Sequence, residues 1–142
     1  TTAAPPVKPV VSRMLLVDPE VPNPKLVAGD LEDTTARLLG RPCVFDVASD
    51  VVEALADVRG DALGVYRVVF INDALHGIQG KQLARFFRKA GVGASLVLLV
   101  SELAQVDIDD FRAHGLNAVL RKPFTQDHLC DLLQKLCFSS SP

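Results

Sequence analysis

The sequence predicts a doubly wound α/β sandwich, in which five parallel strands are covered on both faces by helices. Five short apolar segments alternate along the 142-residue chain with five amphipathic segments. Three of the apolar segments are hydrophobic at nearly every position, which is typical of strands buried on both sides. Because strands and helices alternate, the connections are expected to be right-handed crossovers within a parallel sheet.

Five segments have the length and composition of strands. They comprise residues 13–17, 43–47, 67–71, 95–100 and 117–121. In a doubly wound sheet, the residues that act on a ligand lie at the carboxyl ends of the strands, beside the point where the strand order reverses. The residues that follow these segments therefore decide whether the chain carries a site.

End signals predict the first two helices. Asn23 is a suitable N-cap for a helix that begins at Pro24, since proline is favoured in the first turn and needs no hydrogen bond there. This helix is expected to reach Leu39, where Gly40 ends it. A second helix is expected within residues 49–60.

Apolar spacing predicts the other three helices. The third, closed by Gly91, has an apolar face at positions i, i+3, i+4 and i+7, namely Leu83, Phe86, Phe87 and Ala90. A short fourth helix over residues 107–114 has only three apolar residues to bury, Val106, Ile108 and Phe111. Thr125 is expected to cap the fifth, whose apolar stripe comprises Leu129, Leu132, Leu133 and Leu136.

Composition excludes several classes of function. The 17 acidic and 15 basic residues leave a net charge of −2, so no basic footprint for nucleic acid is expected. No apolar run approaches the roughly 20 residues that span a bilayer, and no direct membrane contact is expected. The cysteines, Cys43, Cys130 and Cys137, have no C-x-x-C spacing and are expected to be reduced thiols in a cytoplasmic domain.

Composition also divides the chain into one domain and two short ends. Residues 1–11 are rich in proline and alanine without apolar periodicity, as in an extended tether. Residues 12–138 hold every predicted element, and residues 139–142 are expected to be a short tail. A tether before the domain suggests that it was excised from a longer polypeptide.

Polar side chains follow four of the predicted strands. Asp18 follows the first, Asn72 and Asp73 the third, Ser101 the fourth and Lys122 the fifth. The carboxyl ends of parallel strands lie at one edge of the sheet, so an acid, an amide, a hydroxyl and an amine are expected to share one pocket. Many α/β domains place polar side chains there only to satisfy backbone groups.

The order and spacing of these elements resemble the response-regulator receiver domains of two-component signalling. The resemblance covers residues 12–138 and is carried by three motifs: Lys122-Pro123-Phe124, the pair Gly77 and Gly80, and the segment 113–118. It implies the flavodoxin-like doubly wound (βα)5 sandwich, with a five-stranded parallel sheet and helices on both faces. It also implies a cis bond before the proline of the first motif.

The resemblance implies a role for each position of the pocket. In working receivers, an aspartate on strand three accepts a phosphoryl group from phosphohistidine, and two acids on strand one help it to bind Mg²⁺. A hydroxyl on strand four and the lysine on strand five contact the phosphoryl oxygens, and an aromatic residue on strand five reports the change to partners. The carboxylates are neutralised by the divalent cation before an anionic donor approaches.

This chain departs from that pattern at three positions. The acceptor position, five residues before Gly77, is Asn72, whose amide is not nucleophilic enough to form an acyl phosphate. Pro19 replaces the second acid of strand one, and Val119 replaces the aromatic residue. We therefore predict a degenerate pseudo-receiver without a catalytic residue, phosphorylation or a bound metal, so that no cofactor is expected and Mg²⁺ binding is lost.

The two kept charges are expected to interact with each other. Asp18 and Lys122 sum to zero, and we predict a direct ion pair between them, with Asn72 hydrogen-bonded to one of the two. Such a pair would hold the domain in one state. The hydroxyl of strand four is supplied by Ser101 if the following loop is one residue short, whereas strict spacing puts Val100 there.

Two alternative functions stay open. In the first, a bulge brings Asp73 into the pocket as phosphoacceptor, with Glu20 as the second acid, although neighbours along a regular strand point to opposite faces. In the second, Arg121 and the basic third helix bind a nucleotide or cyclic dinucleotide. The basic residues of that helix are expected to form its solvated side: Lys81, Arg85, Arg88 and Lys89.

A signalling module is expected rather than an enzyme, because phosphate-loop, dinucleotide and nucleophile-elbow motifs are absent. The resemblance implies histidine kinases or phosphotransfer domains as partners, in the same chain or another, and a hybrid sensor histidine kinase as a possible parent. Partners of the family usually bind the face formed by the fourth helix, fifth strand and fifth helix. The interface candidates there are Phe111, Arg112, Arg121 and Gln126.

Overall fold

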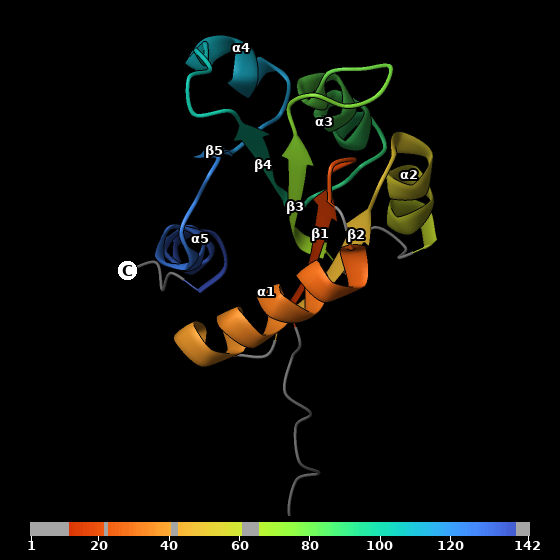
Figure 1. Cartoon of the computed structure of the whole chain (residues 1–142). Coiled ribbons are helices and arrows are strands. Elements are labelled where there is room, and N and C mark those ends of the chain that lie inside the picture. Colours follow the sequence, from red (N-terminus) through yellow and green to blue (C-terminus); the bar gives the residue numbers. More distant parts are fainter. Residues whose placement is uncertain (1–11, 22, 41–42, 61–65, 139–142) are drawn as a thin grey trace, which may run out of the picture.

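The computed structural model describes residues 12–21, 23–40, 43–60 and 66–138, so the predicted tether and tail lie outside the described residues. Strands and helices alternate along the described chain, as predicted (Figure 1). The elements are β1 (Ser12–Val17), α1 (Pro24–Leu39), β2 (Cys43–Ala48), α2 (Val51–Gly60), β3 (Tyr66–Asn72), α3 (Gly80–Lys89), β4 (Ser95–Val100), α4 (Ile108–Ala113), β5 (Ala118–Arg121), α5 (Gln126–Leu133) and the π-helical turn η1 (Gln134–Phe138).

All five strands are parallel and lie in the order β2-β1-β3-β4-β5. The order reverses between β1 and β3, which defines the switch point of a doubly wound sheet. Helices α1 and α5 cover one face, while α2 and α3, with part of α4, cover the other (Figure 1). The predicted flavodoxin-like sandwich is confirmed.

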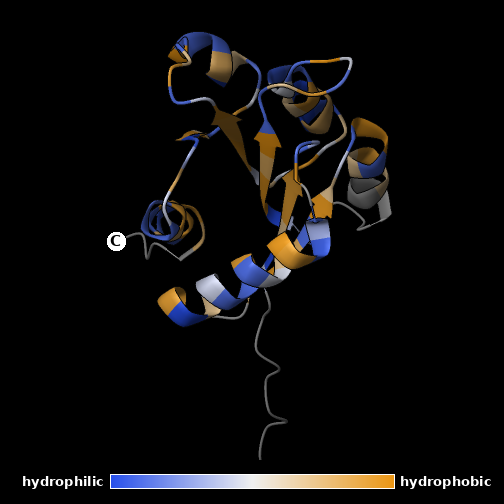
Figure 2. Ribbon diagram, in the orientation of Figure 1, coloured by the Kyte–Doolittle hydropathy of each residue, from blue (hydrophilic) through white to orange (hydrophobic). Residues whose placement is uncertain are grey.

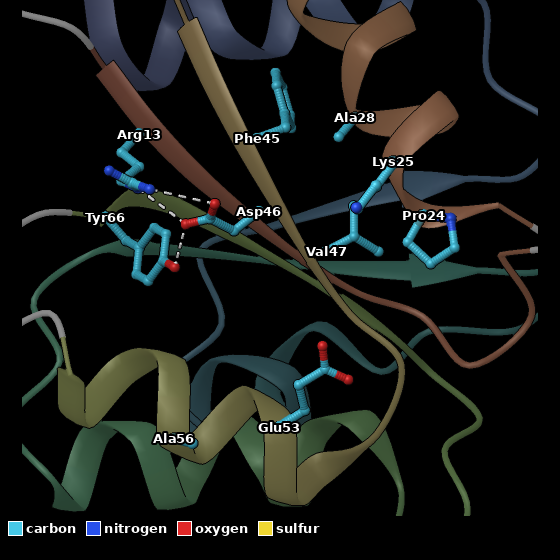
Figure 3. A pocket seen from close by; sticks show the side chains of 10 residues that line it. All are labelled: Arg13, Pro24, Lys25, Ala28, Phe45, Asp46, Val47, Glu53, Ala56 and Tyr66. Atoms are coloured by element: carbon cyan, nitrogen blue, oxygen red, sulfur yellow. Dashed lines mark hydrogen bonds and ion pairs between the residues drawn. The ribbon is translucent and has the colours of Figure 1, made fainter.

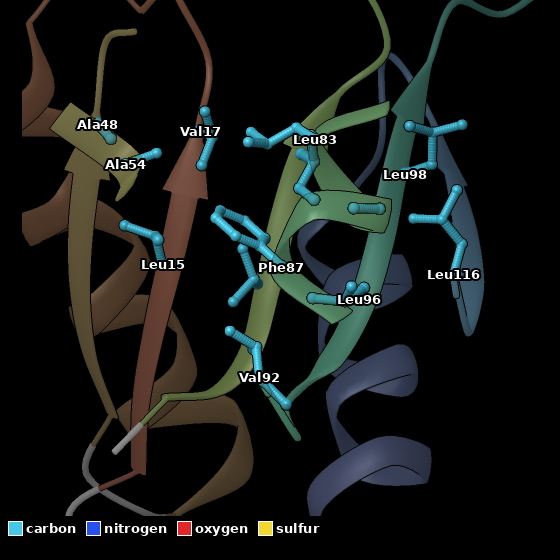
Figure 4. Close-up of a cluster of buried hydrophobic side chains, with 14 of the residues drawn as sticks. Leu15, Val17, Ala48, Ala54, Leu83, Phe87, Val92, Leu96, Leu98 and Leu116 are labelled. Atoms are coloured by element: carbon cyan, nitrogen blue, oxygen red, sulfur yellow. The ribbon is translucent and has the colours of Figure 1, made fainter. Parts of the chain in front are cut away.

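Alternate residues of the central strands fill two hydrophobic cores. On the α2/α3 side, Leu15 and Leu96 pack with Phe87 of α3 (Figure 4). On the α1/α5 side, Met14 and Phe70 pack in a cluster with α5 leucines. Because both faces are covered, the strands are hydrophobic along most of their length, whereas the helices carry polar residues on their outer sides (Figure 2).

The predicted end signals act as expected. Asn23 Oδ1 accepts a hydrogen bond from the backbone N–H of Leu26 at 3.2 Å, which caps α1. Gly40 ends the same helix in the left-handed conformation, with φ of 66°. Thr125 Oγ1 accepts the N–H of His128 at 3.1 Å and caps α5. Local sequence therefore fixes where these helices begin and end.

Three residues predicted to be buried are exposed. Phe86 was placed on the apolar face of the third helix, yet its side chain is 56% exposed, because the buried line of α3 is formed by Leu83, Ala84 and Phe87. Ile108 at the start of α4 is 57% exposed. Ala90 is also exposed, as the C-cap of α3. The core under α3 and α4 is thus smaller than the apolar spacing predicted.

A polar cluster lies at the amino-terminal end of the sheet beside a hollow of about 550 Å³ (Figure 3). Arg13 Nε donates to Asp46 Oδ2 at 2.9 Å, and the hydroxyl of Tyr66 donates to the same oxygen at 2.5 Å. Burial alone would raise the pKa of Asp46, but these hydrogen bonds and the charge of Arg13 outweigh it and hold that pKa below its usual value of 3.8.

This lowered pKa predicts an acid-sensitive contribution to stability. A carboxyl with a lowered folded-state pKa stabilises the fold above its unfolded pKa, and that contribution is lost as the pH falls through the folded value. Because both partners are partly exposed, Asp46→Asn is expected to cost about 1 kcal/mol at neutral pH and less at pH 3, below the unfolded-state pKa. Urea unfolding at both values checks this, with the exposed Asp30→Asn as control. Equal losses at both pH values would contradict the prediction.

The three cysteines are free thiols, as predicted. Cys43 and Cys130 are buried, and Cys137 is half-buried. Burial raises the pKa of all three thiols, which disfavours the reactive thiolate. None of the helices within the described residues has the length and apolar character needed to cross a membrane.

Candidate functional site

The carboxyl ends of β1, β3, β4 and β5 open into one cavity of about 800 Å³. Asp18, Asn72, Ser101 and Lys122 all line it, which confirms that the sheet brings together the four polar residues that follow its strands. Apolar side chains from β1, α1, β4 and the start of the β5–α5 connection form the rest of its wall. The polar groups therefore lie at the mouth of a mainly apolar hollow between α1 and the β5–α5 connection.

Asp18 and Lys122 form a direct ion pair across the cavity. Lys122 Nζ lies 2.7 Å from Asp18 Oδ2, and the side chains are 31% and 8% exposed, respectively. The other carboxylate oxygen of Asp18 accepts the backbone N–H of Glu20 at 2.9 Å. Both oxygens of the carboxylate are thus engaged by this chain's own donors, as the predicted pair requires.

Asn72 does not join this pair, which corrects the prediction that its amide binds Asp18 or Lys122. Its side chain lies in the cavity wall, and Asn72 Nδ2 donates instead to the carbonyl oxygen of Ala74 at 2.9 Å. The amide thereby closes the turn that follows β3. Because this partner is two residues further along the chain, the hydrogen bond depends on the turn and not on the ion pair.

A close backbone approach holds Asn72 in place. The N–H of Gly80, at the start of α3, donates to the carbonyl oxygen of Asp73 at 2.8 Å. A Cβ at Gly80 would lie 2.3 Å from the carbonyl oxygen of Asn72, so no residue with a side chain fits there without moving the end of β3. The second glycine of the Gly77/Gly80 pair therefore has a steric role beside the acceptor position.

The structure also places the remaining positions of the pattern. Of the two candidates for the strand-four position, Ser101 lines the cavity, whereas Val100 is 2% exposed and packs in the core. The hydroxyl of Ser101 is therefore available at the mouth of the cavity. Pro19 follows Asp18 and supplies neither a carboxylate nor an N–H. Val119 of β5 packs partly buried against the core. The bond between Lys122 and Pro123 is cis.

Further acids surround the mouth of the cavity. Glu20, Asp73 and Glu102 are exposed and line it together with Asp18, so four carboxylates and one ammonium give the lining a formal charge of −3. The pairing of β3 with β4 continues to Asn72 without a register shift, and Asp73 donates its N–H to Leu99. The bulge that would turn Asp73 inward is therefore absent from the end of β3, and the register shift that β3 does show, against β1, lies at its start.

These residues do not fit the Mg²⁺ ion that the receiver pattern implies. Of the three positions that would supply carboxylates, only Asp18 does so, and Lys122 already holds that carboxylate. Within the described parts of the chain, no three His, Cys, Asp or Glu side chains come together in a geometry that could hold a metal ion. Mg²⁺ is held in proteins by carboxylates, substrate phosphates and water. To bind it here, the Asp18 carboxylate would have to give up its ion pair with Lys122.

Two basic residues of α3 have structural roles that the sequence did not reveal. Arg88 was expected on a solvated side, but its guanidinium makes four hydrogen bonds to the loops that lead into β4 and β5. Lys81 Nζ lies 2.8 Å from Asp110 Oδ2 on α4. This contact raises the pKa of Lys81 and lowers that of Asp110. Only Arg85 and Lys89 match the expectation of exposed cations.

No family model matches the chain. A curated protein, the transcription factor SKN7 of Chaetomium thermophilum, is 24% identical over 118 residues, which cover 80% of this chain. The matched part is 15% of that protein, so the chain spans a small fraction of the length of its relative.

Solved structures define the fold more closely. The chemotaxis protein CheY4 of Vibrio cholerae has a TM-score of 0.71 at 21% identity, covering 89% of this chain and 98% of that one. The receiver domain of NtrX from Brucella abortus has a TM-score of 0.68 at 26% identity, covering 89% and 99%. The chain has the fold of a response-regulator receiver domain. The fold implied by the sequence motifs is thereby confirmed.

On this receiver fold, the predicted interface candidates differ in their exposure and in whether they already have hydrogen-bond partners. Arg112 is exposed on α4, but Phe111 packs partly buried against the core. Arg121 Nη1 donates to the carbonyl oxygen of Ala104 at 2.6 Å, and Gln126 Oε1 accepts from Arg37 at 3.3 Å. A partner at this face would have to accommodate two side chains that already have partners.

Proposed function

We propose that the chain is a pseudo-receiver: a receiver-like module of a two-component or phosphorelay protein that takes up neither a phosphoryl group nor Mg²⁺. It acts through protein contacts, regulating or presenting a histidine kinase. The observation that carries this proposal is the ion pair of Lys122 with Asp18 beside an amide at the acceptor position. The receiver folds of the solved neighbours support the signalling class.

The lysine and the acceptor position of the cavity are both engaged by the chain itself. Lys122, which would contact phosphoryl oxygens, has Asp18 as its counter-ion. The acceptor position carries the amide of Asn72 and so offers no carboxylate that could be phosphorylated. The lining carries a formal charge of −3, which repels an anionic phosphodonor when no cation is bound. The pair also links the ends of β1 and β5, as expected of a domain held in one state.

The proposed partners are histidine kinases or phosphotransfer domains, in the same polypeptide or another. A hybrid sensor histidine kinase is the proposed parent, and the cytoplasm is the proposed location. The near balance of charges supports a protein partner over nucleic acid. The face formed by α4, β5 and α5 is the proposed contact, with Arg112 as its exposed candidate.

The test is labelling with a small phosphodonor. We expect the full chain, incubated with acetyl phosphate and Mg²⁺, to show no phosphoryl adduct by intact-protein mass spectrometry, because no carboxylate stands at the acceptor position. The receiver domain of NtrX, treated in parallel, is the control for the reagent. A stoichiometric adduct on this chain would contradict the proposal.

A second candidate is a working receiver that uses Asp73. The observation that favours it is that Asp73 and Glu20 line the same cavity as Lys122 and Ser101. Peptide mapping of any adduct separates the two candidates: a phosphoryl group on Asp73, absent from the Asp73→Asn variant, establishes the second. The uninterrupted pairing of β3 with β4 up to Asn72 favours the first.

A further inference from the structure

One corner of the molecule carries half of the large hydrophobic side chains that are exposed in the described residues. Of these six side chains, three lie on α3, α4 or the loop that leads into α4. They are Phe86, Leu103 and Ile108, which are 56%, 91% and 57% exposed. The Lys81–Asp110 ion pair joins α3 to α4, so these residues belong to neighbouring elements (Figure 1). Exposed apolar side chains gathered in one region indicate an interaction site.

The α3 part of this corner is basic. Gln82, Arg85, Phe86 and Lys89 follow the spacing i, i+3, i+4 and i+7 and form one exposed stripe of the helix. They line a hollow of about 420 Å³ together with Ile78 and His114, and no acidic residue lines it. Within the described residues, no hydrogen-bond or ion-pair partner is recorded for Arg85 or Lys89. We call this stripe the basic half.

The part that leads into α4 is acidic. Leu103 and Ile108 stand among Glu102, Asp107 and Asp109, all of them exposed, and no Lys or Arg occurs between positions 102 and 111. We call these five residues the acidic half. The basic half therefore combines exposed apolar surface with positive charge. The acidic half combines it with three carboxylates, against which the Arg121 guanidinium on the backbone of this loop is the one nearby cation among its hydrogen-bond partners in the described residues.

We propose that two copies of this chain associate through this corner, with the basic half of each against the acidic half of the other. A two-fold interface requires that each surface be complementary to its own copy, so that residue i contacts j and j contacts i. Adjacent halves of opposite charge meet this requirement, because one rotation forms both contacts at once. Phe86 of one copy then packs against the apolar residues of the acidic half of the other.

Other occupants fit the corner less well. A small ligand needs a site that encloses most of its surface, whereas Gln82, Arg85, Phe86 and Lys89 are all exposed. A different protein would need a surface with an acidic and a basic part in matching positions, whereas a second copy of this chain supplies both by symmetry. The corner does not include β5 or α5, but it shares α4 with the kinase contact proposed above, since Ile108 and Arg112 lie on the same helix. The association itself does not require phosphorylation.

The test is charge reversal in both halves, measured on the full chain by sedimentation equilibrium. Reversing the basic half (Arg85→Glu with Lys89→Glu) or the acidic half (Glu102→Lys with Asp109→Lys) is expected to raise the dimer Kd at least about tenfold. An equimolar mixture of the two variants is expected to form a heterodimer, since both contacts are again between opposite charges. All four substitutions in one chain are expected to restore the homodimer.

Controls keep the outcome decisive. Lys25→Glu with Lys135→Glu changes the net charge as much as the basic-half reversal does, on exposed residues outside the corner, and should leave the Kd unchanged. Circular dichroism confirms folding, and Phe86→Ser weakens the dimer without any change of charge. A chain that stays monomeric at the highest concentrations tested overturns the proposal. So does a dimer that survives both reversals, or a mixture that fails to associate.

Discussion

Replacing Arg88 with alanine is expected to lower the free energy of unfolding by about 3 kcal/mol, because it leaves three partly buried carbonyl groups without their donor. The guanidinium donates to Gly115 O at 3.0 Å, Val92 O at 2.7 Å and Ala94 O at 2.8 Å. Its fourth hydrogen bond reaches Asn117 Oδ1 at 2.7 Å. One side chain thus ties α3 to the loops that begin β4 and β5.

The contact extends beyond the guanidinium. Asn117 Oδ1 also accepts the N–H of Leu96 at 2.8 Å, so its amide links the start of β4 to the start of β5. Gly115 has φ of 85°, and a Cβ there would lie 2.4 Å from Cγ of Arg88. The glycine that ends α4 therefore leaves room for the arginine as well as adopting a left-handed conformation.

The comparison that isolates this effect uses two further variants. Arg88→Lys keeps the charge but cannot supply four donors in a planar fork, and we expect it to recover less than half of the loss. Arg85→Ala removes the same charge from the exposed side of the same helix and should change stability by no more than about 0.5 kcal/mol. Urea unfolding measures all three. If Arg88→Ala and Arg85→Ala lose equal stability, the guanidinium contacts contribute nothing.

Arg88 also shows where sequence-based prediction stops. Apolar runs and caps predict strands and helix ends because their causes are local, and the structure moves the strand boundaries by one residue at most. The partners of Arg88 lie as far as 29 positions away, so its role follows from tertiary structure alone. The prediction that Phe86 is buried is wrong for a related reason. The spacing rule describes one broad face of the helix, and within that face Ala84, next to Leu83 in sequence, is buried instead of Phe86.

The candidate site also contains one contact that the sequence could predict and one that it could not. The convergence of Asp18 with Lys122 could be predicted, because parallel strands bring their carboxyl ends together and opposite charges pair there. The partner of Asn72 could not, since it depends on the turn between β3 and α3, where Asn72 reaches the carbonyl of Ala74. Asp73 and Glu20 were expected in the pocket only if a bulge turned Asp73 inward, and Glu102 was not predicted there, because loop conformation decides which side chains reach a cavity.

Restoring both lost acids is expected to produce the largest change in function. We expect Pro19→Asp combined with Asn72→Asp to bind Mg²⁺ at least about tenfold more tightly than Asn72→Asp alone, and to be labelled by acetyl phosphate when the single variant is not. The double variant has three carboxylates against Lys122, a negative charge that a divalent cation offsets. In the single variant, the residue beside Asp18 still lacks a carboxylate, and Lys122 keeps Asp18 as its partner.

The matched control separates added charge from loss of the proline ring. Pro19→Asn with Asn72→Asp removes the proline without adding a second strand-one carboxylate, and it should behave like the single variant. Isothermal titration with Mg²⁺ and mass spectrometry after acetyl phosphate treatment give independent readouts, and Mg²⁺ should raise the Tm of the double variant most, because it binds the folded state. Stoichiometric labelling of Asn72→Asp alone would show that the amide at position 72, and not the missing acid at position 19, is what keeps the wild-type chain unphosphorylated.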